Sequence, residues 1–216
     1  MSTVAIRQAL ENALNAIAGI VPSVAITAST TGTSATFTTT TPHGLTSGIS
    51  ITIAGHAGST PSLNGIYSVV VTGASTFTLQ HNVTKAAIAS TVAGTGGTVV
   101  ANLTAWENVA FAPVPLVPWQ AVNFLFARPE NPTFGGTHRR EIGYMQVTLY
   151  YPIQRGTVVV MTRAELIRST FPRGSSFVKS GITVNVPGTP EIVPGMVIDE
   201  SYVVPIKIPY WADIFS

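Results

Sequence analysis

The first hydrophobic pattern along the chain has the spacing of an α-helix. The apolar residues that recur every three or four positions near the N-terminus are Ile6, Leu10, Leu14 and Ile17. Residues at this spacing lie on one face of a helix, and glycine and proline commonly follow the helix end. Because Gly19 and Pro22 come next, the pattern predicts an amphipathic helix over roughly residues 3–18.

The C-terminal half alternates between apolar and polar residues instead, with the period of two that is typical of half-buried strands. The segments with this alternation are residues 120–127, 141–151, 181–186 and 202–210. Proline has no N–H group to donate to a neighbouring strand. Pro205 and Pro209 therefore predict that the last segment forms an edge strand of the sheet.

A second helix is predicted between these strands. Thr162 and Glu165 have the spacing of a capping box, and Pro172 and Gly174 follow them. The segment "TRAELIRSTF" is therefore predicted to form a short helix. The order of helix, strands, helix and strands predicts an α+β fold, in which two helices pack on an antiparallel or mixed sheet.

Residues 23–100 differ in composition from the rest of the chain. Lys85 is the only charged residue in this span, which consists of short segments rich in Thr, Val and Ile separated by Gly, Ser and Pro. Such segments predict short strands. The change in composition predicts an α+β domain formed by residues 1–22 and 101–216, and an inserted all-β module, a small sandwich or barrel, formed by residues 23–100.

Charge is scarce in the whole chain, and this narrows the possible functions. Charged residues make up 9% of the sequence and the net charge is +2, whereas a typical soluble domain has roughly 25% charged residues. This balance argues against general nucleic-acid binding and suits a subunit held among neighbours in an assembly. No apolar run reaches the roughly 18 residues that span a bilayer, so no membrane association is expected.

The residues available for catalysis or metal binding are few. The chain has no cysteine, and aspartate occurs only at Asp199 and Asp213. Three of the four histidines lie in the 23–100 module, and one of them, His43, sits between a proline and a glycine and is expected to shape a turn. The fourth, His138, adjoins two arginines, which oppose a metal ion. We therefore expect no enzyme activity, no metal site and no cofactor.

The densest charged segment, residues 127–141, is predicted to be a loop that contacts a partner protein. It is longer than most hairpin loops, and charge is scarce elsewhere. A plain solvated loop is the alternative. The partner-contact candidates in it are Arg128, Glu130, Phe134, His138, Arg139, Arg140 and Glu141.

Outside the module, five segments follow one another in a specific order: "IRQALENALNAI", "AWENVAFAPV", "GYMQVTLYYPIQRG", "AELIRSTFPRG" and "VVPIKIPYWA". This order resembles that of phage tail terminator proteins. The resemblance implies a structural virion protein of the tail or neck, assembled in the cytoplasm of a bacterial host. It implies a ring, usually a hexamer, that binds the tail tube protein, ends tube polymerisation and joins a head–tail connector or stopper protein. DNA would pass through the lumen of the ring without specific binding.

Inside the module, the segments "PHGLTSGISITIAG", "LNGIYSV" and "STFTL" are similar to a small β module that recurs in phage tail proteins. A related half-domain lies beside the catalytic cysteine of ubiquitin-activating enzymes. The likeness implies that His43 shapes a turn and takes no part in catalysis. Two other functions stay open at this point: another neck or tail-tube ring protein, and an adhesin that binds host glycans through the module.

Overall fold

The computed structural model describes residues 2–17, 19–133 and 136–215. The chain folds into two compact units, which are named after their strands. The barrel unit consists of residues 18–103 and 112–117. The sheet unit consists of residues 1–17, 104–111 and 118–216.

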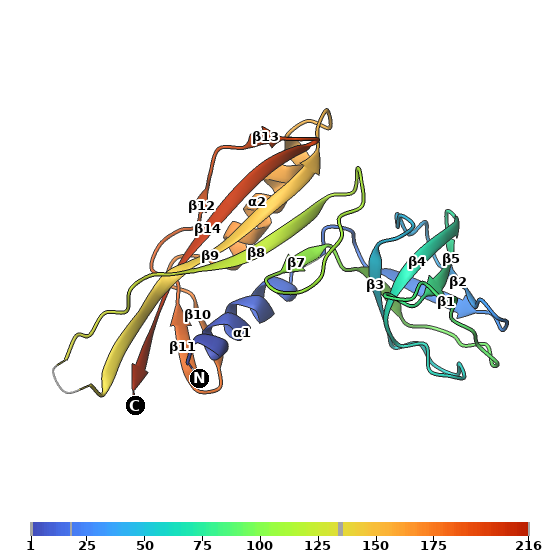
Figure 1. The fold of residues 1–216 in the computed structure, drawn as a ribbon, viewed down its shortest axis with the longest axis horizontal. Helices are drawn as coiled ribbons and strands as arrows, with labels where there is room; N and C mark the ends of the chain where they lie inside the picture. The colour runs from blue at the N-terminus through green and yellow to red at the C-terminus, as the bar shows by residue number, and fades with distance from the viewer. Residues whose placement is uncertain (1, 18, 134–135, 216) are drawn as a thin grey trace. The chain divides into compact units, whose positions relative to one another are not determined.

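The barrel unit is a closed six-stranded β-barrel (Figure 1). Its strands are β1 (Val24–Ser29), β2 (Thr36–Thr39), β3 (Ser50–Ala54), β4 (Gly65–Gly73), β5 (Thr76–Gln80) and β6 (Thr98–Ala101). They follow the order β1-β2-β5-β4-β3-β6, and β6 also pairs with β1, which closes the barrel. Every second side chain of a strand points inward. In this way Phe37 and Phe77 become fully buried, with their rings stacked at 5.3 Å.

The chain enters and leaves the barrel on neighbouring strands. β1 and β6 pair in antiparallel fashion, with Val24 opposite Val99 and Ala25 opposite Thr98. Residues paired in this way have Cα atoms about 5 Å apart. The two ends of the barrel segment therefore lie side by side.

The sheet unit is an eight-stranded sheet that forms a half-barrel (Figure 1). Its strands are β7 (Thr104–Trp106), β8 (Trp119–Phe126), β9 (His138–Pro152), β10 (Ser176–Lys179), β11 (Ile182–Asn185), β12 (Glu191–Ile192), β13 (Met196–Ile198) and β14 (Ser201–Phe215). The order is β10-β11-β14-β9-β8-β7, and β12 and β13 also pair with β14. β9 and β14 pair along their full length, from Ser201 opposite Pro152 to Phe215 opposite His138.

The central strands have two different faces. On the inner face, side chains such as Met145, Val147 and Ile206 have no exposed surface. On the outer face, the alternating residues are more exposed, and Tyr144 keeps 46% of its surface accessible. This difference follows from the period of two in the sequence, which sends successive side chains to opposite faces.

Both helices of the described residues lie against the inner face. The helices are α1 (Ser2–Asn15) and α2 (Val158–Thr170). The guanidinium of Arg7 in α1 lies 4.9 Å from the ring of Phe124, and buried Arg163 in α2 donates a hydrogen bond to the Gln120 side chain at 3.1 Å. Phe124 and Gln120 are buried residues of β8. Neither helix is long and apolar enough to cross a membrane.

The predicted α+β fold is wrong. Strands make up 45% of the chain and helices 13%, so the protein is mostly β, with a closed barrel and a half-barrel. The sequence pattern missed β1, β7, β10, β12 and β13, which are two to six residues long. The two or three residues of β7, β12 and β13 are too few to show an alternation.

The predicted edge strand, residues 202–210, is part of a central strand. β14 pairs with β9 on one side and with β11, β12 and β13 on the other. In these described pairings, neither Pro205 nor Pro209 has a partner in β11, β12 or β13. The prolines, which lack an N–H group, thus occupy the breaks between three short neighbouring strands.

α2 begins earlier than predicted. Its first residue is Val158, and the capping residue Thr157 makes no side-chain hydrogen bond to the helix. Thr162, predicted as the cap, lies inside the helix and donates a hydrogen bond to the Val158 carbonyl at 2.8 Å. The first turn of α2 was not predicted because it contains three successive valines, and β-branched residues favour strands. Burial of Val160 against the inner face favours the helix instead.

The pairing of β1 with β6 leads to a prediction about the proposed domain division. Joining Pro22 to Ala101 through a short Gly/Ser linker should leave the domain formed by residues 1–22 and 101–216 folded, because the deleted residues 23–100 begin and end on paired strands. The variant should keep one cooperative thermal transition by circular dichroism. A non-cooperative melt would contradict the division.

Candidate functional site

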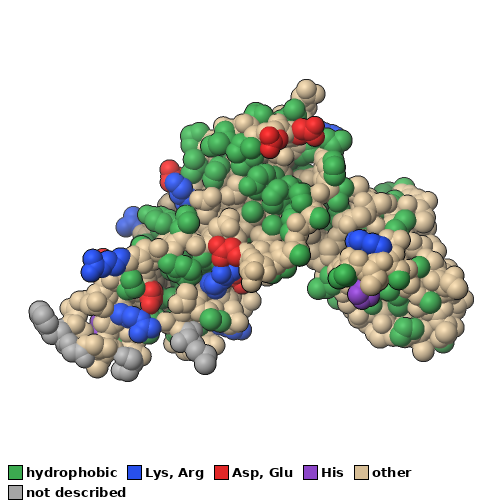
Figure 2. All heavy atoms as spheres, viewed as in Figure 1, with side chains coloured by type: hydrophobic (Ala, Val, Ile, Leu, Met, Phe, Trp, Pro, Cys, Tyr) green, Lys and Arg blue, Asp and Glu red, His purple; other side chains and the backbone are tan. Residues whose placement is uncertain are grey.

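The outer face of the sheet unit carries an apolar surface. Leu125 of β8 lies opposite Tyr144 of β9, which lies opposite Pro209 of β14. Leu125 is 50% exposed. Figure 2 shows hydrophobic side chains on the surface of the sheet unit where these strands run. Contiguous exposed apolar side chains are typical of protein contact surfaces.

β9 and β14 continue past the end of β8 and carry a charged cluster there. Arg140 donates two hydrogen bonds to the Asp213 carboxylate, from Nε to Oδ1 at 2.8 Å and from Nη2 to Oδ2 at 3.0 Å. His138 Nε2 lies 3.0 Å from Asp213 Oδ1. The strand register brings these residues together, because Arg140 lies opposite Asp213 and His138 lies opposite Phe215.

The cluster has the electrostatics of a fixed ion pair. The hydrogen bond from Arg140 lowers the pKa of Asp213 to about 2, partly opposed by burial and supported by the hydrogen bond to His138. The same pairing raises the pKa of Arg140 above its usual value. A bidentate arginine–carboxylate pair also fixes the orientation of both side chains. Asp213 therefore stays ionised at neutral pH.

Two aromatic side chains flank the ion pair. The Arg140 guanidinium lies 4.3 Å from the centroid of the Trp211 ring, and the His138 ring stacks on Phe215 at 4.7 Å. Phe215 is 76% exposed. Arginine and aromatic residues are enriched in protein interfaces. We call His138, Arg140, Trp211, Asp213 and Phe215 the ribbon end, and its chemistry suits binding of another protein.

The predicted loop over residues 127–141 is too long, because His138–Glu141 already belong to β9. Their polar side chains resemble those of a loop, but β14 supplies a paired residue for each of them. Strand alternation sends Arg139 and Glu141 to the inner face. There Arg139 bonds Glu141 at 3.0 Å and the Ser2 hydroxyl at 2.9 Å.

The other predicted contact residues lie in the segment after β8. Arg128 and Glu130 are exposed. The backbone of Glu130 forms two hydrogen bonds with that of Arg140, at 2.8 and 2.9 Å, so this segment is attached to the ribbon end. Phe134 lies outside the described residues.

Sequence reasoning missed three residues of the ribbon end, Trp211, Asp213 and Phe215. Asp213 is separated by 73 positions from Arg140 and by 75 from His138. No local pattern connects positions so far apart, since the connection depends on the register of β9 with β14. The only available signal was the rarity of aspartate in the chain.

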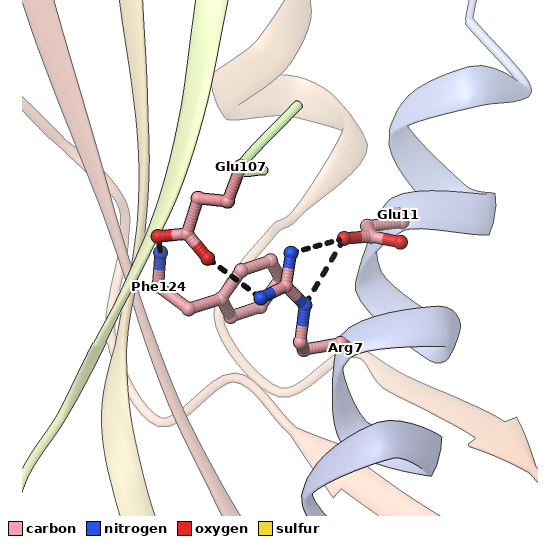
Figure 3. Close-up of polar contacts among 4 residues, drawn as sticks. All are labelled: Arg7, Glu11, Glu107 and Phe124. Carbon is pink, nitrogen blue, oxygen red and sulfur yellow. Dashed lines mark hydrogen bonds and ion pairs between the residues drawn. The ribbon is translucent and has the colours of Figure 1, made fainter. Parts of the chain in front are cut away.

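A second charged cluster attaches α1 to the sheet (Figure 3). Arg7 donates hydrogen bonds to Glu11 at 3.2 and 3.3 Å and to Glu107 at 2.6 Å. Glu107 also accepts the backbone N–H of Phe124 at 2.8 Å. An open cavity of about 430 Å³ lies beside the cluster, lined by α1 and by Trp106, Glu107 and Val109. The bonds of Glu107 to Arg7 and to the Phe124 backbone join α1 to β8, which gives the cluster a structural role.

The buried histidines of the barrel unit are held by the fold. His43 Nδ1 accepts the Leu45 N–H at 3.0 Å. His56 lies between the Gly96 carbonyl, 2.8 Å from Nδ1, and the Ser29 hydroxyl, 2.9 Å from Nε2. Ser29 and both rings are buried, so a substrate cannot reach them. The described residues contain no group of three or more His, Cys, Asp or Glu side chains that could hold a metal ion.

Comparison with known proteins points to one family. A family model described as phage tail terminator protein matches residues 83–210, more than half of the chain. One similar solved structure shares 23% sequence identity, covers 52% of this chain and 80% of its own, and has a TM-score of 0.46. That likeness is too distant to carry an argument. No curated protein matches the chain.

The Arg140–Asp213 pair leads to a pH-dependent prediction. Because the pKa of Asp213 is lowered from 3.8 to about 2, the pair stabilises the folded state above the unfolded pKa and loses this effect as the pH falls toward 2. Asp213→Asn should lower the Tm at pH 7 by about 1–3 °C, the effect of one partly exposed ion pair. The difference from wild type should shrink between about pH 4 and pH 2. Thermal melts across this range test it, and a constant difference would contradict the assignment.

Proposed function

This chain belongs to the phage tail terminator protein family, and we propose that copies of it form a ring, a hexamer, at the head-proximal end of a phage tail tube. The ring ends polymerisation of the tube and presents a surface to the head–tail connector. DNA passes through the lumen without specific binding. The observation that carries this proposal is the family match over residues 83–210.

The surface of the sheet unit supports a role in assembly. An apolar outer face combined with charges that neutralise one another suits contact with a protein more than attraction of nucleic acid. The family also points to a structural and non-enzymatic role. The protein is a component of the phage virion, in its tail.

The exposed residues around the ribbon end are the proposed contacts with the tail tube or the connector. Arg128 and Glu130 lie on the segment attached to the ribbon end, where the backbone of Glu130 bonds that of Arg140. Charged groups at the rim of an interface mainly determine the rate and register of docking. Arg139 contributes indirectly, since its bond to Ser2 holds the start of α1.

The oligomeric state tests the proposed ring. The purified full-length protein should form closed rings by negative-stain electron microscopy, with the mass of about six subunits by light scattering. Isolated tail tube protein should elongate less when these rings are added. A monomer over the whole range of accessible concentrations would contradict the proposal.

Arg128 offers a separate test of tube or connector binding. Among the described residues it has no ion-pair partner, so Arg128→Glu should leave the Tm unchanged. Phages that carry this variant should produce tails of irregular length or tails that fail to join heads. Arg173→Glu, which changes an exposed arginine after α2, is the matched control. Normal tails and normal infectious yield from Arg128→Glu would remove this residue from the contact.

A further inference from the structure

α2 has a second apolar side that faces away from the sheet. Its inward residues, such as Val160 and Ile167, have no exposed surface. The exposed apolar residues grouped on its other side are Val158, Val159 and Leu166, which we call the helix surface, and exposed Thr162 lies among them. A helix that only covers a sheet normally carries polar residues on this side. The helix surface therefore indicates a further contact.

The sheet unit thus has two apolar surfaces that point in opposite directions. α2 lies against the inner face through the bond between Arg163 and Gln120, so the helix surface points away from that face. Leu125, Tyr144 and Pro209 point away from the opposite face, and we call them the sheet surface. Two such surfaces cannot cover each other within one chain. They can do so between copies arranged head to tail.

Charged residues of both signs lie beside each of the two surfaces. Lys207 lies on the outer face next to the sheet surface, opposite Glu191 of β12. On α2, Glu165 and Arg168 form an ion pair at 2.6 Å beside the helix surface. Each surface therefore has one acidic and one basic neighbour. Two copies can meet with Lys207 facing Glu165 and with Glu191 facing Arg168.

We propose that the sheet surface of one copy binds the helix surface of the next copy, and that this contact builds the ring. The inference rests on the proposed function and adds which residues join the subunits. A head-to-tail contact repeats from copy to copy and closes when the rotation per copy divides a full turn. An apolar centre with neutralised charges at its rim is typical of lasting subunit interfaces.

Two substitutions in the full-length protein test this contact. Tyr144→Asp places a charge in the sheet surface, and Val159→Asp places one in the helix surface. An aspartate at position 159 is compatible with the fold, because negative charge is favourable in the first turn of a helix. Each variant alone should lose the ring and run as a monomer by light scattering. Val178→Asp is the matched control, at an exposed valine of β10 outside both surfaces, and should keep the ring.

Mixing the two variants tests the pairing of the surfaces directly. The intact helix surface of the Tyr144→Asp chain can bind the intact sheet surface of the Val159→Asp chain, so an equimolar mixture at high concentration should form heterodimers. Circular dichroism confirms that both chains are folded, and Leu125→Asp replaces Tyr144→Asp if the latter is not. A mixture that stays monomeric, or single variants that keep the ring, would overturn the inference.

Other outcomes separate this inference from the proposed function. A wild-type protein that forms no ring contradicts the proposed function itself. Variants that keep the ring but no longer bind the tail tube would assign these surfaces to the tube protein, and would overturn the contact between copies.

Charge reversal gives a second measurement. Lys207→Glu and Glu165→Lys should each raise the concentration at which rings form by about two- to fivefold, the effect of an exposed ion pair. A chain with both substitutions should return to the wild-type value. A double variant that assembles no better than the single variants would overturn the facing of Lys207 and Glu165.

Discussion

The pairing of β9 with β14 is the interaction on which the sheet unit depends. The two strands stay in one register over the 15 residues of each, and β8 and the short strands β11, β12 and β13 add to them. The register determines which side chains form the core under the helices and which lie on the outer face of the sheet. A shift of β14 by one residue against β9 would turn Lys207 inward and Ile206 outward, while the side chains of β9 kept their faces. One set of backbone hydrogen bonds thus determines both the core and the residues of the outer face.

The sequence revealed the elements that are long and periodic. α1, β8 and the greater part of β9 could be predicted, because each shows several turns or alternations of its pattern. The place of β14 in the sheet could not, because its prolines indicate an edge in isolation and fit a central strand only when three short neighbours leave gaps beside them. The balance of helix and strand was misjudged for a related reason. Short strands are stabilised by the strands with which they pair. A pairing strand that is far away in the sequence leaves no local pattern.

The candidate site shows the same limit at the level of single residues. Scarcity of charge drew attention to residues 127–141, and His138 and Arg140 do lie at one surface. The sequence did not reveal that Arg139 and Glu141 face the other way, since that requires knowing that the strand begins at His138. Trp211, Asp213 and Phe215 had no local signal at all. A chain with few charges can still build an ordered charged cluster when a long strand pair brings together the ones it has.

The pairing of β1 with β6 has a consequence for how this chain can evolve. The six barrel strands form one continuous segment, residues 24–101, and because its first and last strands pair, its two ends lie about 5 Å apart. A folded segment with adjoining ends adds little closure entropy however many residues it contains. A genetic exchange could replace this segment with another whose ends also lie close together. The remaining sequence would need almost no change. The sequence of the barrel can therefore change between related viruses independently of the sequence of the sheet unit.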